Sequence, residues 1–370
     1  MDNPTQIHLL VVALGFALGL IFGAAVQKTN FCAMGAVSDV VSMGHWNRMR
    51  MWLLAIAVAI IGTGALGAAG LIEPGKSLYA SARFTWLSYI VGGLLFGTGM
   101  TLASGCGSKN MVRLGAGNLK ALLVLGVLAV TAYMSIKGAL APLRVHVLDA
   151  VYLHLEGGQT LPQLLARGLD WSASACTGLA AAVVALLLLA FVVRDHAFRR
   201  DRDGWIGGLL IGLVIVGGWY VTGHLGYLAE HPDTLEEAFI ATNSRRPESL
   251  SYVGPVAYTL ELGLLWTDAS LRATFGIASV LGTLAGAFIY ASASRSFRWE
   301  SFSSAADMRR HLIGAVLMGF GGVTAVGCTI GQGISGFSTL ALGSLLTFAS
   351  IVTGCTLSLK WLYRSMQDET

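Results

Sequence analysis

Nine apolar runs, each close to twenty residues long, dominate this sequence. They lie near 7–26, 51–72, 85–104, 119–138, 174–193, 205–222, 272–292, 311–327 and 338–361. A helix of about 20 apolar residues matches the thickness of the hydrocarbon core of a bilayer. Only 12% of the residues are charged, against about 25% in ordinary soluble domains. The sequence therefore predicts an all-α polytopic membrane protein with about nine transmembrane helices.

Two shorter apolar pieces, near 31–43 and 251–266, are too short to cross a bilayer. We expect them to form re-entrant or interfacial helices. The polar stretches 143–171 and 223–250 are expected outside the membrane and partly helical. The first apolar run lacks a basic flank and a small-residue cleavage site, so we expect it to be retained as a span.

Positive charges indicate the orientation of the chain. If the basic loop 194–203 is cytoplasmic, alternation through nine spans places sixteen of the 24 Lys and Arg residues on the same side. The positive-inside rule then predicts an external N-terminus and a cytoplasmic C-terminus. No basic cluster is interleaved with aromatic residues, so we expect no nucleic-acid partner, only lipid and a small substrate.

One segment of the chain recurs. "GGLLFGTGMTLASGC" (92–106) aligns without a gap with "GAVLMGFGGVTAVGC" (314–328), at an offset of 314 − 92 = 222, and seven of fifteen positions are identical. Chance matching in glycine-rich segments is the alternative explanation. We expect two repeats, 1–172 and 204–370, joined by a connecting helix and loop at 173–203. An odd number of spans separates equivalent positions, so the repeats would be inverted, as in many transporters.

Both copies of the repeated segment end in a cysteine that follows a glycine and interrupts an apolar run. A helix broken inside lipid is tolerable only where protein or a water-filled cavity surrounds the free backbone groups. Helix N-termini at such breaks bind anions, and a thiol is a soft contact that suits an anion with a terminal sulfur. The candidate substrate-binding residues are Cys32, Cys106, Cys328, Gly105, Gly107, Gly327, Thr329, Gln332 and Lys109.

Each of these residues also has a plainer interpretation. Free cysteines are commonly buried apolar filler, and we expect that role for Cys176 and Cys355. No C-x-x-C is present, so neither a disulfide framework, a metal site nor a cofactor is expected. Thr329 and Gln332 either bind oxyanion oxygens or satisfy the broken backbone. Lys109 either attracts the anion at the inner mouth, together with Arg113 one helix turn on, or only anchors the element.

Three charged residues elsewhere raise smaller hypotheses. Glu261 is the one acid in its short apolar segment, and an ionisable residue there suggests proton coupling. If the segment is interfacial, Glu261 is simply hydrated. Arg245 and Arg246 either collect anions before entry or belong to a solvated loop.

Three motifs, "QKTNFCAMGAVSDV" (27–40), "GTGMTLASGCGSKNMVRLGAGNLKAL" (97–122) and "GFGGVTAVGCTIGQGISGFSTLALGSLL" (319–346), resemble the YeeE/YedE family of bacterial inner-membrane proteins. The resemblance covers essentially the whole chain. It implies thiosulfate transport, with the motif cysteines at Cys32, Cys106 and Cys328 on the substrate path. It also implies a TusA-like cytoplasmic sulfur carrier as a partner. Some relatives are linked to other sulfur or selenium species.

The sequence thus favours a non-enzymatic inner-membrane importer of thiosulfate or a closely similar anion. A dianion moving inward against 100 mV is opposed by about 2 × 2.3 kcal/mol, so uptake needs consumption inside, a coupled ion or delivery to a carrier. One alternative is a membrane thiol enzyme or sulfurtransferase that forms a cysteine persulfide. Another is an anion channel in which the cysteines are filler.

Overall fold

The structure is a computed structural model that describes residues 3–169, 173–232 and 234–368, and most of this chain is helical. Its helices are α1 (Pro4–Thr29), α2 (Ala33–Met43), α3 (Asn47–Ala68), α4 (Trp86–Leu102), α5 (Gly107–Gly115), α6 (Leu119–Ile136), α7 (Ala141–Leu143), α8 (Leu161–Leu169), α9 (Ala173–Val193), α10 (His196–Arg200), α11 (Arg202–Tyr220), α12 (Val253–Leu264), α13 (Phe275–Ala293), α14 (Ala305–Thr324) and α15 (Leu342–Asp368).

Short turns and strands complete the described chain. The turns are the 3₁₀ segments η1 (Pro74–Lys76) and η2 (Leu78–Ala80) and the π-helical segments η3 (Arg144–Leu148), η4 (Val221–Leu225) and η5 (Gly331–Gly336). The strands form two antiparallel pairs, β1 (Arg83–Phe84) with β2 (Leu153–His154) and β3 (Tyr227–Leu228) with β4 (Ala238–Phe239). Strand β1 places Arg83 opposite His154, and β3 places Tyr227 opposite Phe239.

Eight helical segments of the described chain are long and apolar enough to cross a membrane. They are Pro4–Met43, Asn47–Ala68, Trp86–Gly115, Leu119–Ile136, Cys176–Val193, Arg202–Leu225, Phe275–Ala293 and Leu342–Ser365. The prediction of an all-α polytopic membrane protein is confirmed. The predicted span near 311–327 is α14, a helix of 20 residues whose first turns carry Asp307, Arg309 and Arg310 and which is therefore not among the eight.

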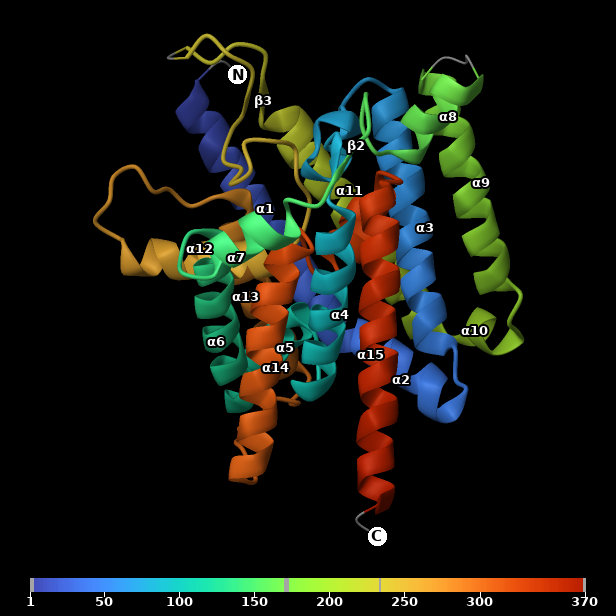
Figure 1. The fold of residues 1–370 in the computed structure, drawn as a ribbon, viewed down its shortest axis with the longest axis vertical. Helices are drawn as coiled ribbons and strands as arrows, with labels where there is room; N and C mark the ends of the chain where they lie inside the picture. Colours follow the sequence, from blue (N-terminus) through green and yellow to red (C-terminus); the bar gives the residue numbers. More distant parts are fainter. Residues whose placement is uncertain (1–2, 170–172, 233, 369–370) are drawn as a thin grey trace.

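The chain begins and ends on opposite faces of the molecule, which we call the N-terminal and C-terminal faces (Figure 1). The two short apolar pieces are the helices α2 and α12, of 11 and 12 residues. The stretch 143–171 is partly helical, through η3 and α8, and its last two residues lie outside the described chain. In the stretch 223–250 the described residues are helical only at 223–225, the end of η4, and otherwise form turns, bends and the two-residue strands β3 and β4.

Helix contacts come in pairs. α1 packs along α13 while α11 packs along α3, and α4 packs on α15 while α14 packs on α6. α4 also packs on α14, and α1 on α11. The short helices follow the same pattern, since α2 contacts α3, α4 and α15, and α12 contacts α13, α14 and α6. The buried core lies between these paired helices.

Glycine allows the central pair, α4 and α14, to touch through their backbones. A Cβ atom at Gly92 would lie 2.7 Å from the carbonyl oxygen of Gly321, and one at Gly314 would lie 2.6 Å from that of Gly99. No larger residue fits at either position without separating the helices. Close approach through small residues is how membrane helices gain packing energy where lipid offers no hydrophobic drive.

Candidate functional site

The three predicted cysteines share one backbone arrangement. Each lies two residues after a residue in the left-handed region, with φ of 56° at Asn30, 55° at Ser104 and 58° at Val326. Left-handed residues end helices, and here they end α1, α4 and α14. We call the segments 30–32, 104–106 and 326–328 the cysteine breaks. A β-branched valine with positive φ is strained and persists only where its surroundings enforce it.

Each break leads into a new helical segment, which Cys32 and Cys106 cap at its N-terminus and which begins three residues after Cys328. The Cys32 Sγ accepts a hydrogen bond from the Gly35 N–H at 3.4 Å, and the Cys328 Sγ accepts one from the Gly331 N–H at 3.4 Å. Cys106 is the N-cap residue of α5, and its thiol lies 3.3 Å from the Ser108 hydroxyl. The Cys32 sulfur thus acts as the N-cap acceptor that serine or aspartate usually provides, and the Cys328 sulfur makes the same contact with a backbone N–H at the start of η5.

The three thiols gather at one buried place. The side chains of Cys32, Cys106 and Cys328 are 6%, 1% and 1% exposed. Cys106 lies close enough to interact with Cys32, with Cys328 and with the Thr329 hydroxyl. Among the described residues, no nitrogen or oxygen atom is a hydrogen-bond partner of the buried Thr329 oxygen, whose polar neighbour is the Cys106 thiol. We call Cys32, Cys106, Cys328 and Thr329 the thiol cluster. A buried hydroxyl without a nitrogen or oxygen partner is uncommon, and a ligand atom is one explanation for it.

The Gln332 amide is already occupied by protein atoms. Its Nε2 donates to the Ala325 carbonyl at 2.6 Å, and its Oε1 accepts from the Ser344 hydroxyl at 2.6 Å. Asn110 plays the same role at the 104–106 break, where its Nδ2 donates to the Gly105 and Cys106 carbonyls. Both amides satisfy carbonyls freed by the broken helices, which is the plainer of the two interpretations considered for Gln332.

The glycines next to Cys106 and Cys328 differ in whether their position could accommodate a side chain. Gly327 has a φ of 155°, and a Cβ there would lie 3.0 Å from the Gln332 Cγ, so the backbone requires glycine. A Cβ at Gly105 or Gly107 would meet nothing closer than 3.4 Å and 3.7 Å. The segments that follow also differ, because α5 has nine residues and η5 is a six-residue π-helical turn. The helix-dipole argument therefore applies to α5 far better than to η5.

A small cavity opens between the thiol cluster and the N-terminal face. Its volume is about 180 Å³, and we call it the N-side cavity. It reaches Gly327, next to Cys328, and its polar lining consists of Tyr79, Asn243, Ser244, Glu248, Ser249, Ser251 and Tyr258. The Asn243 Oδ1 is buried there and has no hydrogen-bond partner in the described part of the chain. Among the described residues, no lysine or arginine lines this cavity.

A larger cavity, the C-side cavity, lies between the cysteine breaks and the C-terminal face. It measures about 570 Å³ and is lined by Gln27, Lys28, Asn30, Ser104, Lys109, Arg113, Ala116, Asn118, Lys120, Ser296, Arg298, Glu300, Asp307 and His311. Five of these side chains are cationic and two are carboxylic. This end of the candidate path is therefore electropositive.

Two cationic side chains of the C-side cavity donate hydrogen bonds to residues of the cysteine breaks. Lys109 is 8% exposed, and its Nζ donates to the Asn30 Oδ1 at 2.7 Å. Arg113 donates from Nη1 to the Ser104 carbonyl at 2.6 Å. Within the described chain, no carboxylate forms an ion pair with Lys109. Burying an ammonium group without a counter-ion is costly, so its position favours binding of an anion over simple anchoring.

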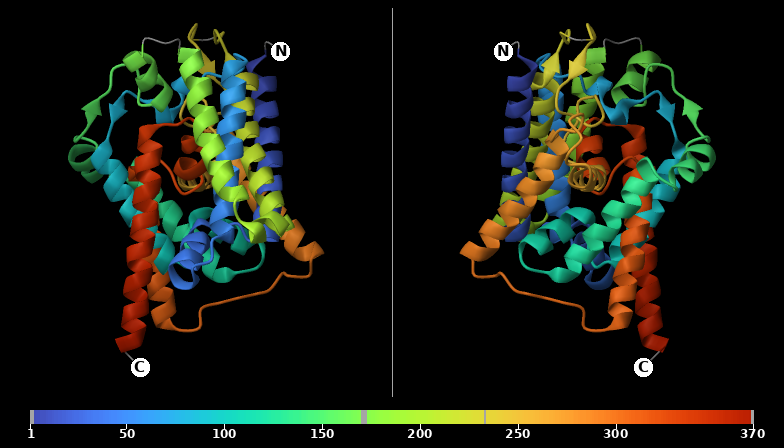
Figure 2. Two further views of the ribbon diagram at one scale, coloured as in Figure 1. Left: turned by 90° about the vertical axis from the view of Figure 1, so that its right-hand side faces the viewer. Right: turned by 90° about the vertical axis from the view of Figure 1, so that its left-hand side faces the viewer.

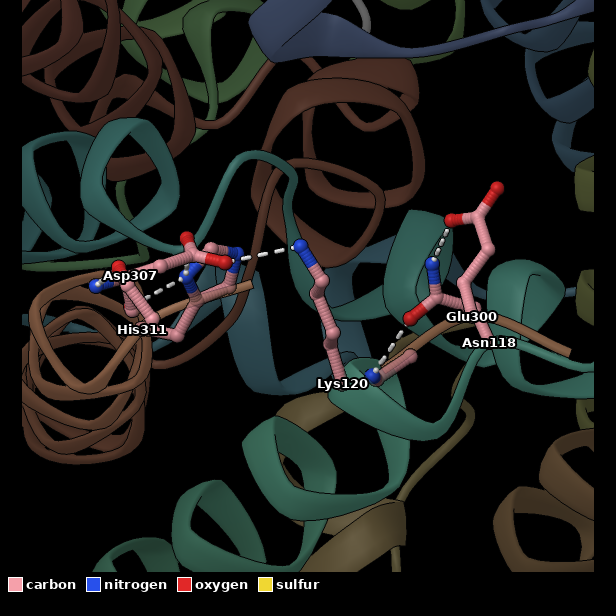
Figure 3. Close-up of polar contacts among 7 residues, drawn as sticks. Asn118, Lys120, Glu300, Asp307 and His311 are labelled. Carbon is pink, nitrogen blue, oxygen red and sulfur yellow. Dashed lines mark hydrogen bonds and ion pairs between the residues drawn. The ribbon is translucent and has the colours of Figure 1, made fainter. Parts of the chain in front are cut away.

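The loop 294–304 between α13 and α14 crosses the C-terminal face and joins the rim of the C-side cavity (Figure 2). The Glu300 carbonyl accepts from the Leu119 N–H at 2.8 Å, and the Glu300 carboxylate accepts from the Asn118 Nδ2 at 2.6 Å. Nearby, Asp307 binds both Lys120 at 2.8 Å and His311 at 3.1 Å (Figure 3). These contacts tie the rim formed by α5 and α6 to the loop and to α14.

The remaining predicted residues lie apart from the path. Glu261 is buried but forms an ion pair with Lys137 at 2.7 Å and accepts from the Tyr133 hydroxyl at 3.1 Å. Arg245 and Arg246 line a separate surface cavity near β1. Cys176 and Cys355 are buried, and the Cys355 thiol accepts from the Thr101 hydroxyl at 3.3 Å. Because the Lys137 ammonium group compensates its charge, the Glu261 carboxylate does not need to bind a proton.

Sequence reasoning missed two residues of the N-side cavity, Asn243 and Glu248. Both fall in "ATNSRRPESL" (241–250), whose polar composition is typical of a solvated loop. The one available signal was the Thr242-Asn243 pair, which repeats Thr29-Asn30 ahead of the first break.

Comparison with known proteins agrees with this geometry. A family model described as sulphur transport matches residues 28–357. A thiosulfate transporter TsuA of Escherichia coli is 27% identical over 340 residues, covering 86% of each chain. A thiosulfate transporter TsuA of Spirochaeta thermophila is 25% identical over 354 residues, covering 92% of this chain and 96% of the relative. Since the matched region holds all three cysteine breaks, this chain belongs to the sulphur transport family of multi-pass membrane proteins.

Proposed function

We propose that this protein imports thiosulfate, or a closely similar anion with a terminal sulfur, across the bacterial inner membrane. The observation that carries the proposal is the thiol cluster, which lies buried between the largely apolar N-side cavity and the polar C-side cavity. The curated relatives are named as thiosulfate transporters, and a transport family favours this role over a persulfide-forming enzyme.

The chemistry of the thiol cluster suits such a substrate. A thiol is a weak donor and a polarizable partner for the terminal sulfur of thiosulfate. The Thr329 hydroxyl can donate to a sulfonate oxygen. Weak contacts at successive positions let an anion enter and leave, which transport requires. No covalent bond between cysteine and substrate is needed, and Cys32, Cys106 and Cys328 act as contacts along the path.

The substrate path is proposed to lie between two inverted repeats, residues 1–172 and 204–370, joined by 173–203. The exchange of helix pairs supports this division, since α1 on α13 corresponds to α11 on α3. The left-handed residues agree as well, because Ser104 and Val326 differ by 326 − 104 = 222 positions, the offset of the repeated segment.

The C-terminal face is proposed to be cytoplasmic, as the excess of lysine and arginine on that side supports. The N-side cavity is then the entry and the C-side cavity the exit, and lipid surrounds the outward face of the helices. A TusA-like carrier is proposed to receive the sulfur at the cytoplasmic face, on the family resemblance alone.

The test is uptake of labelled thiosulfate into proteoliposomes that contain the purified protein. We expect saturable uptake that unlabelled thiosulfate inhibits and that sulfate, which lacks a terminal sulfur, does not. Selenite as a second competitor reports on the tolerance for related species. Equal inhibition by sulfate and thiosulfate would show that the thiols do not select the substrate.

A further inference from the structure

Glu248 is the one carboxylic acid among the described residues that line the N-side cavity. Its Oε2 accepts a hydrogen bond from the Ser244 hydroxyl at 2.9 Å. Its backbone is fixed by η4, since its N–H donates to the Thr222 Oγ1 at 3.1 Å and its carbonyl accepts from the same hydroxyl at 2.5 Å. Glu248 is therefore held in the wall of the cavity by defined contacts.

No cation within the described chain forms an ion pair with Glu248. In its own loop, Arg245 and Arg246 line the separate surface cavity near β1. From η2 and α12 the titratable groups that face it are the phenols of Tyr79 and Tyr258. The Glu248 carboxylate is thus surrounded by neutral groups.

The nearby basic side chains are directed at another group or exposed. The His224 ring on η4 faces the Leu71 carbonyl at 3.1 Å. Arg272, just before α13, is exposed. The nearest position on α13 itself is Gly276, where a Cβ would lie 3.9 Å from the Glu248 Oε1.

This carboxyl group shares a space of about 180 Å³ with any anion that reaches Cys328 from the N-terminal face. An ionised Glu248 and a dianion in that space repel each other strongly, because few water molecules fit between them. Neutral Glu248 reverses the interaction, since its O–H becomes a donor to the anion. The cavity has no lysine or arginine that could compensate instead.

We propose that Glu248 is the proton-binding residue of anion entry, so that the N-side cavity takes up one proton with each dianion. The inference rests on the proposed function and adds a second, obligatory species to its entry step. A coupled proton also halves the net negative charge that must be moved inward.

The expected pH dependence follows from the Glu248 carboxyl. Burial raises the pKa of Glu248 to about 7, against the opposing hydrogen bonds from Ser244 and the backbone of Asn243. A raised pKa means that the neutral form predominates below about pH 7 and is lost above it. Between pH 6 and pH 8 the neutral fraction falls about tenfold. Apparent affinity scales with the competent fraction, so thiosulfate binding should weaken about tenfold over the same interval.

The experiment is calorimetric titration of the purified full-length protein with thiosulfate at pH 6 and pH 8. The wild type should bind about tenfold more weakly at pH 8. The isosteric Glu248→Gln variant should bind equally at both pH values, and Glu248→Asp should remain pH-dependent. Glu261→Gln, which alters a buried acid outside the cavity, should keep the wild-type dependence.

A second measurement needs no variant. In weak buffer at pH 8, binding of thiosulfate to the wild type should take up close to one proton per anion, read with a pH indicator. Binding without proton uptake, or a Glu248→Gln variant that keeps the tenfold dependence, would overturn the inference and leave the proposed function standing. Absence of thiosulfate binding at either pH would overturn both.

Discussion

The two cavities of this protein are surrounded by similar pairs of packed helices, which we call the frame, but the charges of their lining residues differ. The N-side cavity is small, about 180 Å³, and among its described lining residues one carboxylic acid stands beside hydroxyl, amide, phenol and apolar groups. The C-side cavity is about three times larger, about 570 Å³, and contains five cationic side chains. The helix pair α1–α13 matches α11–α3, and α4–α15 matches α14–α6. The comparison teaches that matching helix pairs can support cavities whose lining residues differ.

In the proposed orientation, the anion leaves a cavity without cations and arrives in one that attracts it. This attraction works against an inside-negative membrane potential, which opposes a dianion by about 2 × 2.3 kcal/mol per 100 mV. Substitutions in the packed helices and in the lining of each cavity test the two parts of this contrast separately.

The largest effect is expected from the frame. Gly92→Val and Gly314→Val should each destabilise the protein by about 1–3 kcal/mol or more, because each forces a side chain into the backbone of the partner helix. Thermal unfolding in detergent measures both. Gly126→Val on α6 is the control, since nothing lies within 4 Å of a Cβ there. Loss of stability in only one of the two variants would contradict the equivalence of the halves.

The next largest effect is expected from the C-side cavity. Lys109→Met should lower uptake into proteoliposomes by roughly ten- to a hundredfold, because a hydrogen bond to a charged group contributes about 1.5–3 kcal/mol. Lys360→Met on α15, which lies outside the C-side cavity, should leave uptake unchanged. Wild-type uptake by Lys109→Met would mean that this buried ammonium only anchors the first half.

The smallest effect is expected from the N-side cavity. Asn243→Leu removes an amide whose Oδ1 has no hydrogen-bond partner among the described residues. A neutral hydrogen bond contributes about 0.5–1.5 kcal/mol, so the KM for external thiosulfate should rise roughly two- to tenfold while the maximal rate stays constant. A lower maximal rate with an unchanged KM would place Asn243 in the frame and not in the entry.

The sequence predicts those helices whose positions depend on local composition. The runs 119–138 and 174–193 correspond closely to α6 (Leu119–Ile136) and α9 (Ala173–Val193), because length and apolarity decide such helices locally. The cysteine breaks were visible for a similar reason, since glycine and cysteine interrupt an apolar run.

The sequence could not predict the cavities, because residues far apart in the chain line them. Lys109 meets Asn30 across 79 positions, and the Gln332 amide is occupied by a hydroxyl on another helix. Glu261 and Glu248 show the limit most clearly. Glu261 is the one acid of an apolar segment and Glu248 lies in a polar stretch, and only the fold gives the first a lysine and the second a cavity with no lysine or arginine among its described lining residues.

The account depends most on the Cys106 thiol, where the two halves meet, and uptake of labelled thiosulfate by Cys106→Ala tests it most directly. Cys355→Ala is the matched control, because Cys355 is equally buried but belongs to no cysteine break, and its thiol accepts a hydrogen bond from the Thr101 hydroxyl. We predict that Cys106→Ala inserts and unfolds like the wild type yet takes up no thiosulfate, while Cys355→Ala transports normally. Wild-type uptake by Cys106→Ala would contradict the claim that thiols bind the substrate.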